Sequence, residues 1–141
     1  MKGSISSGWL VGLLLLCIGS CGDVDQWQVK RITDGDTIVL TRRGTEEKVR
    51  LLGIDAPEKA QKPWGERSKA HLEKLVGTSE VRLETDVRER DRYGRLLAHV
   101  WVGKALINQE MVASGHALLY TVPPNVKYAE RLQQAERRAH L

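Results

Sequence analysis

Three acidic side chains stand out because each lies where an expected strand begins or ends. Asp36 opens an apolar run directly after the Asp34-Gly35 turn, while Asp55 and Glu58 follow the run at 49–54. If these two runs are antiparallel neighbours, the start of one lies beside the end of the other, and three carboxylates converge. Oxygen ligands without His or Cys favour Ca²⁺ or Mg²⁺ over zinc. Taken singly, each acid is equally consistent with an ordinary turn or capping role.

Two arginines accompany these acids. Arg50 opens the run that leads to Asp55, and Arg95 follows Asp91-Arg92-Tyr93-Gly94, whose glycine permits a tight entry into the next strand. Planar guanidinium groups bind phosphate oxygens in pairs, so acids and arginines together suit chemistry on a phosphodiester. The alternatives are a surface ion pair for Arg50 and a strand-edge charge for Arg95.

The elements that must position these residues are read from hydrophobic periodicity. Alternation and turn residues predict five strands, and helical spacing predicts three helices. Five strands interrupted by one helix indicate a mainly β fold with α-helices, namely a five-stranded barrel of the OB type with three helices packed on it. A sandwich is the competing architecture, but the helix after the third strand lies where a barrel needs a long crossover. The expected strands are 27–32, 37–41, 49–54, 81–87 and 96–102, and the expected helices are 65–76, 106–113 and 128–139.

Residues 1–21 differ from the rest of the chain. A single positive charge at Lys2 precedes a short apolar run, and small residues stand directly before Cys21. This pattern resembles a bacterial lipoprotein signal, in which Cys21 is the lipidation candidate and anchors the protein to a membrane. The alternatives are an ordinary secretory signal and a short membrane anchor. We expect an exported protein, either a membrane-anchored lipoprotein of the cell envelope or a secreted or periplasmic one, with residues 22–141 as one domain.

Composition agrees with one core and a basic surface. The 141 residues carry a formal net charge of +4, 41% of them are hydrophobic, and both cysteines lie within residues 1–21. The domain is therefore expected to hold together by its core and not by a disulfide. A sequence pI of about 9.2 favours an anionic partner such as nucleic acid, although this signal alone is weak.

Four separated blocks, in this order, resemble the staphylococcal nuclease (thermonuclease) family. The resemblance extends from about Trp27 to Ala139, and it implies a Ca²⁺-dependent endonuclease that acts on DNA and RNA and leaves 3′-phosphate ends. It also implies an OB-fold barrel with three helices. The blocks are Asp34-Gly35-Asp36-Thr37, Arg50-Leu51-Leu52-Gly53-Ile54-Asp55-Ala56-Pro57-Glu58, Asp91-Arg92-Tyr93-Gly94-Arg95 and Ile107-Asn108-Gln109-Glu110-Met111-Val112-Ala113-Ser114-Gly115.

The resemblance assigns roles to residues at the first three blocks. Asp36 and Asp55 are similar to direct calcium ligands, and Ala56 stands at a position that ligates through its backbone carbonyl. Glu58 resembles the residue proposed as general base. The remaining catalytic positions are the phosphate-binding pair Arg50 and Arg95.

The resemblance also implies a nucleotide pocket formed by Arg92, Tyr93 and Tyr120. Val122 departs from the pattern, because a second pocket tyrosine is expected there. The chain ends at 140–141, where the family pattern continues into a segment that packs the last helix, so we expect weaker packing of that helix. The rival functions are a non-catalytic OB-fold module that binds nucleic acid or protein at the cell envelope, and an envelope-binding domain with a calcium-stabilised turn. We expect a monomer.

Overall fold

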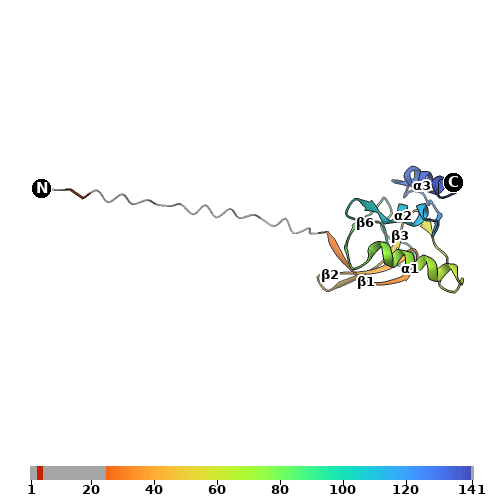
Figure 1. Ribbon diagram of the computed structural model, residues 1–141, viewed down its shortest axis with the longest axis horizontal. Helices are drawn as coiled ribbons and strands as arrows, with labels where there is room; N and C mark the ends of the chain where they lie inside the picture. The colour runs from red at the N-terminus through yellow and green to blue at the C-terminus, as the bar shows by residue number, and fades with distance from the viewer. Residues whose placement is uncertain (1–2, 5–24, 141) are drawn as a thin grey trace.

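The computed structural model describes residues 3–4 and 25–140, and residues 25–140 form a barrel with helices packed around it (Figure 1). The strands follow the order β3-β2-β1-β5-β6, and a further pairing between β3 and β6 closes the ring. This closed five-stranded barrel confirms the expected OB-type fold. Its strands are β1 (Gln26–Asp34), β2 (Thr37–Arg42), β3 (Thr45–Leu51), β5 (Glu80–Glu84) and β6 (Leu96–Val102), and the short β7 (Ala105–Leu106) pairs with β6.

Two strand pairings set the positions of the residues singled out above. β2 and β3 are antiparallel with Thr37 opposite Arg50, so Asp36 lies beside the end of β3, and its carbonyl accepts the Leu51 N–H at 2.8 Å. β3 and β6 are parallel with Arg50 opposite Leu97. The closing pair therefore brings Arg50 next to the strand that begins just after Arg95.

The three expected helices are present within one residue at each end. α1 (Trp64–Val76) buries a stripe at helical spacing against the barrel, α2 (Ile107–Ala113) is almost wholly apolar on its buried face, and α3 (Ala129–Ala139) buries Leu132 and Ala135. Short apolar side chains fill the barrel. The largest fully buried ones are Ile38, Leu40, Leu51, Ile54, Leu72, Leu106, Ile107, Met111 and Leu132.

Two strands differ from the prediction, since the expected strand at 81–87 ends at Glu84 and the third strand differs at both ends. The expected third strand at 49–54 instead starts at Thr45 and ends at Leu51, and β4 (Ile54–Asp55) pairs with β8 (Leu118–Leu119). Gly53 separates the two strands because its φ is +77°, which only glycine adopts readily. A Cβ at Gly53 would also lie 2.4 Å from Leu132 Cδ1 of α3. Asp55 is thus carried by a separate short strand and not by the end of β3.

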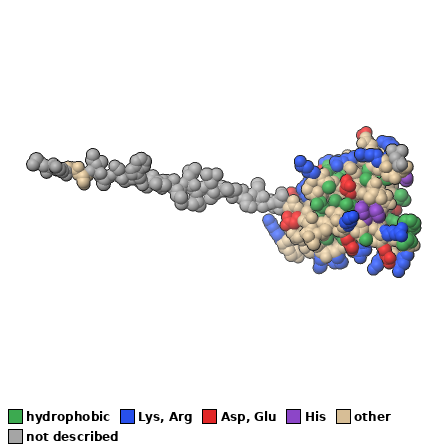
Figure 2. Space-filling view, in the orientation of Figure 1, with side chains coloured by type: hydrophobic (Ala, Val, Ile, Leu, Met, Phe, Trp, Pro, Cys, Tyr) green, Lys and Arg blue, Asp and Glu red, His purple; other side chains and the backbone are tan. Residues whose placement is uncertain are grey.

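Apart from residues 3–4, the expected signal segment 1–21, with Cys21, lies outside the described residues. No helix among residues 3–4 and 25–140 combines the length and apolar character that crossing a bilayer requires. Lys and Arg side chains are spread over the visible face of the domain, with Asp and Glu between them (Figure 2). The basic residues form no single patch on this face. The place where an anionic ligand binds must therefore be inferred from individual arginines and not from the net charge.

Candidate active site

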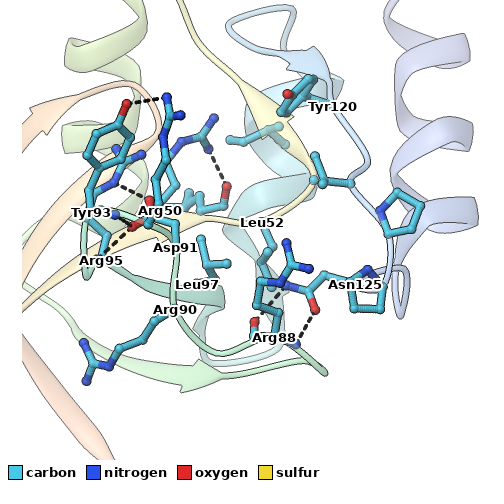
Figure 3. A pocket seen from close by; sticks show the side chains of 17 residues that line it. Arg50, Leu52, Arg88, Arg90, Asp91, Tyr93, Arg95, Leu97, Tyr120 and Asn125 are labelled. Carbon is cyan, nitrogen blue, oxygen red and sulfur yellow. Dashed lines mark hydrogen bonds and ion pairs between the residues drawn. The ribbon is translucent and has the colours of Figure 1, made fainter.

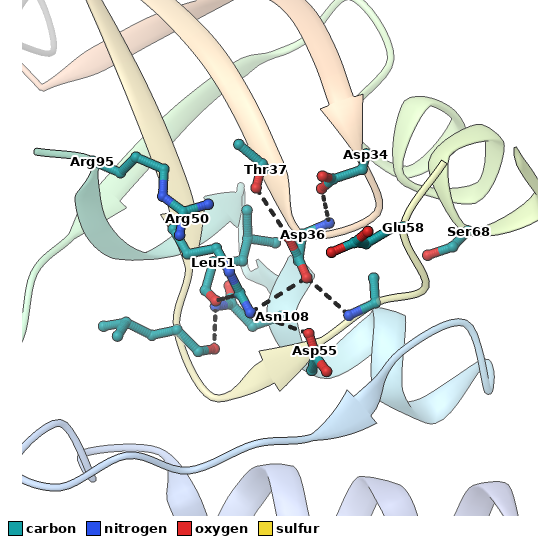
Figure 4. Close-up of polar contacts among 12 residues, drawn as sticks. Asp34, Asp36, Thr37, Arg50, Leu51, Asp55, Glu58, Ser68, Arg95 and Asn108 are labelled. Carbon is teal, nitrogen blue, oxygen red and sulfur yellow. Dashed lines mark hydrogen bonds and ion pairs between the residues drawn. The ribbon is translucent and has the colours of Figure 1, made fainter. Parts of the chain in front are cut away.

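Asp36 is the buried acid at the centre of the site (Figure 4). Only 6% of its surface is exposed, and fixed donors hold both carboxylate oxygens. The Thr37 hydroxyl donates to Oδ1 and the Ala56 N–H donates to Oδ2, both at 2.9 Å. Arg50 Nη2 lies 3.3 Å from Oδ2. A buried carboxylate is tolerated where hydrogen bonds and a countercharge compensate its lost hydration, and Asp36 has both.

Asp55 contacts Arg50, the same arginine that contacts Asp36. Arg50 Nη2 lies 3.5 Å from Asp55 Oδ1, while Nη1 donates to the Leu51 carbonyl at 2.6 Å. The Asp55 side chain is 61% exposed, so solvent and solutes reach it. Two carboxylates that face one position, with no His or Cys among them, form a donor set that suits a hard cation such as Ca²⁺.

Glu58 does not join this pair in the way the strand pattern predicts. Within the described part of the chain, no three His, Cys, Asp or Glu side chains form a group that could hold a metal ion. The turn after Asp55 explains this, since the Glu58 N–H donates to Gln61 Oε1 at 2.7 Å and Gly65 packs against the Glu58 carbonyl. The exposed Glu58 side chain lies on the Asp34 and Ser68 side of the site (Figure 4).

Asp34 and Gly35 hold Asp36 in place, although sequence reasoning treated them only as a turn. Asp34 Oδ1 accepts the Asp36 N–H at 3.1 Å. Burial raises the pKa of Asp34, and the neighbouring Asp36 carboxylate raises it further. A Cβ at Gly35 would lie 1.8 Å from Ser68 Oγ, so the turn packs directly against α1. Gly35 is therefore needed for close packing against α1, while Asp36 beside it supplies a candidate metal ligand.

Arg95 is held by Asp91, a residue to which the sequence assigned no role. Arg95 Nε donates to Asp91 Oδ2 at 2.7 Å, and the N–H groups of Tyr93 and Arg95 both donate to Oδ1 at 2.9 Å. Burial raises the pKa of Asp91, but these bonds with Arg95 and Tyr93 outweigh it, so the pKa is lowered. Among the described residues, Asp91 engages only Nε of the guanidinium, which leaves both terminal nitrogens for a substrate. The local signal was a turn-forming aspartate two residues before Tyr93.

A pocket of about 690 Å³ lies beside this site (Figure 3). It contains Arg50 and Arg95 together with the three residues expected to bind a nucleotide, Arg92, Tyr93 and Tyr120. Five of its lining residues are arginines and one, Asp91, is an acid, so the pocket suits an anionic ligand. Its lining residues are Arg50, Leu51, Leu52, Gly53, Ile54, Arg88, Arg90, Asp91, Arg92, Tyr93, Arg95, Leu97, Tyr120, Val122, Pro123, Pro124 and Asn125.

The aromatic residues of the pocket are open to solvent. Tyr93 is 68% exposed and Tyr120 is 56% exposed. Arg92 lies 4.8 Å from the centre of the Tyr93 ring and donates to its hydroxyl at 2.6 Å. Val122 lines the same pocket, so one apolar group there is aliphatic where the family pattern leads us to expect an aromatic one. Exposed rings beside arginines are suited to stacking on nucleic-acid bases.

Comparisons with known proteins agree with this geometry. The family model described as "Staphylococcal nuclease homologue" matches residues 48–141. The chain is 37% identical over 118 residues to a thermonuclease of Staphylococcus hyicus, with 80% of this chain and 70% of the relative covered. It is 38% identical over 120 residues to a thermonuclease of Staphylococcus intermedius, covering 82% and 71%. The chain belongs to the staphylococcal nuclease family.

The chain is also similar to endonuclease YncB of Bacillus subtilis. It is 34% identical over 116 residues, which cover 77% of this chain and 55% of that protein. The family assignment confirms the resemblance that the four sequence blocks carry. The roles that the resemblance gives to individual residues stay predictions, and the structure adds where each side chain lies.

Asn108, from the last block that marks the staphylococcal nuclease family, anchors the segment that leads to Asp55. Its side chain is fully buried, and Oδ1 accepts the Val100 N–H at 2.9 Å. Nδ2 donates to the Leu52 carbonyl at 2.8 Å and to the Ala98 carbonyl at 3.3 Å. The amide therefore ties the turn after β3 to β6.

Proposed function

We propose that this nuclease of the staphylococcal nuclease family is a Ca²⁺-dependent endonuclease that hydrolyses phosphodiester bonds of DNA and RNA and leaves 3′-phosphate ends. The observation that carries the proposal is the position of Arg50, which contacts both Asp36 and Asp55 and also lines the arginine-rich pocket. A phosphate bound by Arg50 therefore lies next to an oxygen donor pair. The relatives described as thermonucleases and as an endonuclease support the same activity.

The residues proposed to hold Ca²⁺ are Asp36 and Asp55, with the backbone carbonyl of Ala56. This donor set fits a hard cation, because it contains only oxygen atoms and its two carboxylates approach one guanidinium nitrogen. When bound, Ca²⁺ supplies positive charge that polarises the phosphate and favours ionisation of the attacking water.

Protein side chains bind the phosphate and accept the proton. Arg50 and Arg95 bind the phosphate oxygens on which negative charge grows as the water oxygen bonds to phosphorus and the bond to the 5′ oxygen breaks. The 5′ oxygen leaves with the electron pair of that bond and takes a proton from solvent, which gives a 5′-hydroxyl. Glu58 accepts the proton from water, and its exposure gives it access to solvent. A general base supplies roughly 10²- to 10⁴-fold acceleration, about 3 to 5 kcal/mol, against the roughly 8 to 23 kcal/mol that enzymes supply in total. The arginines and the cation must therefore supply most of the rate enhancement.

Substrate binding in this proposal uses Arg92, Tyr93 and Tyr120. Stacking on an aromatic ring is worth roughly 1 to 3 kcal/mol per base and tolerates any base, which suits a nuclease that accepts both DNA and RNA. We further propose that the protein is an exported monomer, anchored through Cys21 to the bacterial cell envelope. The small residues before Cys21 support the anchor.

The test uses the purified full chain with single-stranded DNA, duplex DNA and RNA, in Ca²⁺ and in chelator. We expect cleavage only with Ca²⁺, products with 3′-phosphate ends, and a higher Ca²⁺ requirement for Asp36→Asn, because the amide removes one anionic ligand. Asp25→Asn, which neutralises an exposed acid outside the site, is the matched control. Equal cleavage in chelator would contradict the calcium role, and a folded protein that binds DNA without cutting it would support the binding module instead.

A further inference from the structure

The arginines of the pocket differ in whether the protein neutralises them. Arg50 meets two aspartates, and Arg95 is bound by Asp91. Arg90 forms a two-point ion pair with Glu47, at 2.7 Å and 3.1 Å, and its side chain points away from the pocket (Figure 3). These three charges are compensated within the fold, so their presence does not require a further ligand.

Arg88 and Arg92 have no acidic partner among the described residues, and Arg92 still donates to the Tyr93 hydroxyl. Arg88 lacks even a side-chain hydrogen bond: it is exposed and lines the same pocket, yet its guanidinium forms no hydrogen bond or ion pair with any residue in the ranges 3–4 and 25–140. Figure 3 shows Arg88 beside Asn125, with Leu52 and Leu97 between it and the group formed by Arg50 and Arg95. The pocket thus has a second cationic position, separated by apolar side chains from the proposed cleavage position.

The backbone of Arg88 is held firmly even though its side chain is not. Asn125 is only 6% exposed, and its Oδ1 accepts the Arg88 N–H at 2.7 Å while its Nδ2 donates to the Arg88 carbonyl at 2.8 Å. The Lys127 N–H donates to Asp86 Oδ2 at 3.0 Å. Three hydrogen bonds therefore join the loop after β5 to the loop before α3 and fix where the Arg88 side chain starts.

We propose that Arg88 binds a second phosphate of the substrate strand, next to the phosphate that is cleaved, and that Asn125 is the residue that positions it. This inference rests on the proposed nuclease function and defines its substrate class as a polynucleotide with a charged flanking phosphate. A pocket of about 690 Å³ lies in the size range of sites for whole small-molecule ligands, so it has room for more than one phosphate group. A guanidinium held at such a site matches phosphate in both charge and geometry.

The experiment compares oligonucleotides of equal length and measures cleavage at one defined phosphodiester by analysing the products. In one substrate of each pair, the linkage next to the measured one is a normal phosphate, and in the other substrate it is an uncharged methylphosphonate. One pair carries this change on the 5′ side of the measured linkage, and a second pair carries it on the 3′ side. We expect the wild-type full chain to prefer the charged flank on one side by about tenfold in kcat/KM, which corresponds to about 1.4 kcal/mol. Arg88→Gln abolishes that preference, because the cation proposed to contact the flanking phosphate is removed.

Arg137→Gln is the matched control, since it removes an exposed arginine of α3 that lies outside the pocket. It should retain the tenfold preference. Asn125→Ala should lose the preference together with some thermal stability, whereas a merely structural Asn125 would lose stability alone, and that result would overturn its positioning role. Arg88→Gln overturns the proposal if it leaves the preference unchanged on both sides, or lowers kcat/KM equally for charged and uncharged flanks.

A binding measurement separates this inference from the proposed function. If no form of the protein cuts any substrate, the nuclease proposal fails, but the affinity for a single-stranded oligonucleotide still reports on Arg88. Each phosphate contact contributes about 0.7 to the slope of log affinity against log salt concentration. A slope that becomes shallower by about 0.7 in Arg88→Gln, but not in Arg137→Gln, supports the phosphate contact, and an unchanged slope overturns it.

Discussion

Two groups of acids and bases in this domain have similar chemistry and different accessibility. In the candidate site, Asp36 and Asp55 share Arg50 beside an open pocket, and Asp55 is largely exposed. In the second group, Glu84 at the end of β5 has a side chain that is 21% exposed and is bound by three donors. It accepts hydrogen bonds from Lys127 Nζ at 2.5 Å, Tyr128 OH at 2.7 Å and Trp101 Nε1 at 3.0 Å.

The difference shows how one type of interaction serves either substrate binding or stability. Burial raises the pKa of Glu84, but the hydrogen bonds from Lys127, Tyr128 and Trp101 outweigh it and lower the pKa to about 2. Since Lys127 and Tyr128 directly precede α3, this carboxylate attaches the last helix to the barrel. The Asp36 and Asp55 pair instead retains an approach from solvent, so its charge is available to a ligand.

The largest expected effect separates the two groups by activity. Arg95→Ala should lower kcat by about 10³-fold, or about 4 kcal/mol, because it removes donors that the transition state needs. Its unfolding temperature should change little, since the Tyr93 N–H and the residue 95 N–H still bond to Asp91. Steady-state kinetics and thermal unfolding measure the two quantities. Normal cleavage by Arg95→Ala would contradict the role assigned to Arg95. Arg137→Ala is the control for loss of one positive charge.

The intermediate effect concerns stability. Glu84→Gln should lower the free energy of unfolding by about 1 to 2 kcal/mol at pH 7 and leave kcat unchanged at temperatures where the variant is folded. Because the folded pKa of about 2 lies below the ordinary value of 4.5, the stabilisation is complete above pH 4.5 and disappears as the pH falls toward 2. Chemical denaturation at several pH values should therefore show the two proteins converge in acid. A constant difference across that range would contradict the assigned role of the carboxylate charge.

The smallest effect comes from a histidine pair that belongs to neither group. The rings of His71 and His116 stack with centroids 4.0 Å apart, and burial lowers the pKa of His71, with a further contribution from His116. The unfolded chain therefore binds more protons, and stability falls as the pH drops below 6.5. His71→Gln should reduce this loss by less than about 1 kcal/mol, measured by denaturation at pH 7.5 and 5.5. A steeper loss in the variant would contradict this.

The sequence predicted which residues lie near the site more accurately than it predicted the contacts between them. Hydrophobic alternation and the turn residues correctly predicted that the second strand begins beside the end of the third, because pairing of adjacent strands follows from local pattern. They did not predict the turn after Asp55, in which the Glu58 N–H donates to Gln61 Oε1 and Gly65 packs against the Glu58 carbonyl. The contact between Arg88 and Asn125 joins residues 37 positions apart in two irregular loops, and no periodicity predicts such a pair.

The parallel pairing of β3 with β6 has a consequence for the newly made protein. Arg50 and Arg95 are distant in sequence and are brought into one pocket only when this last pair of strands closes the barrel. Long-range parallel pairing is intrinsically slow to form, because the entropy of closing a long loop must be overcome first. A chain that is still on the ribosome therefore contains both arginines without a site, and any nuclease activity begins only when folding is completed.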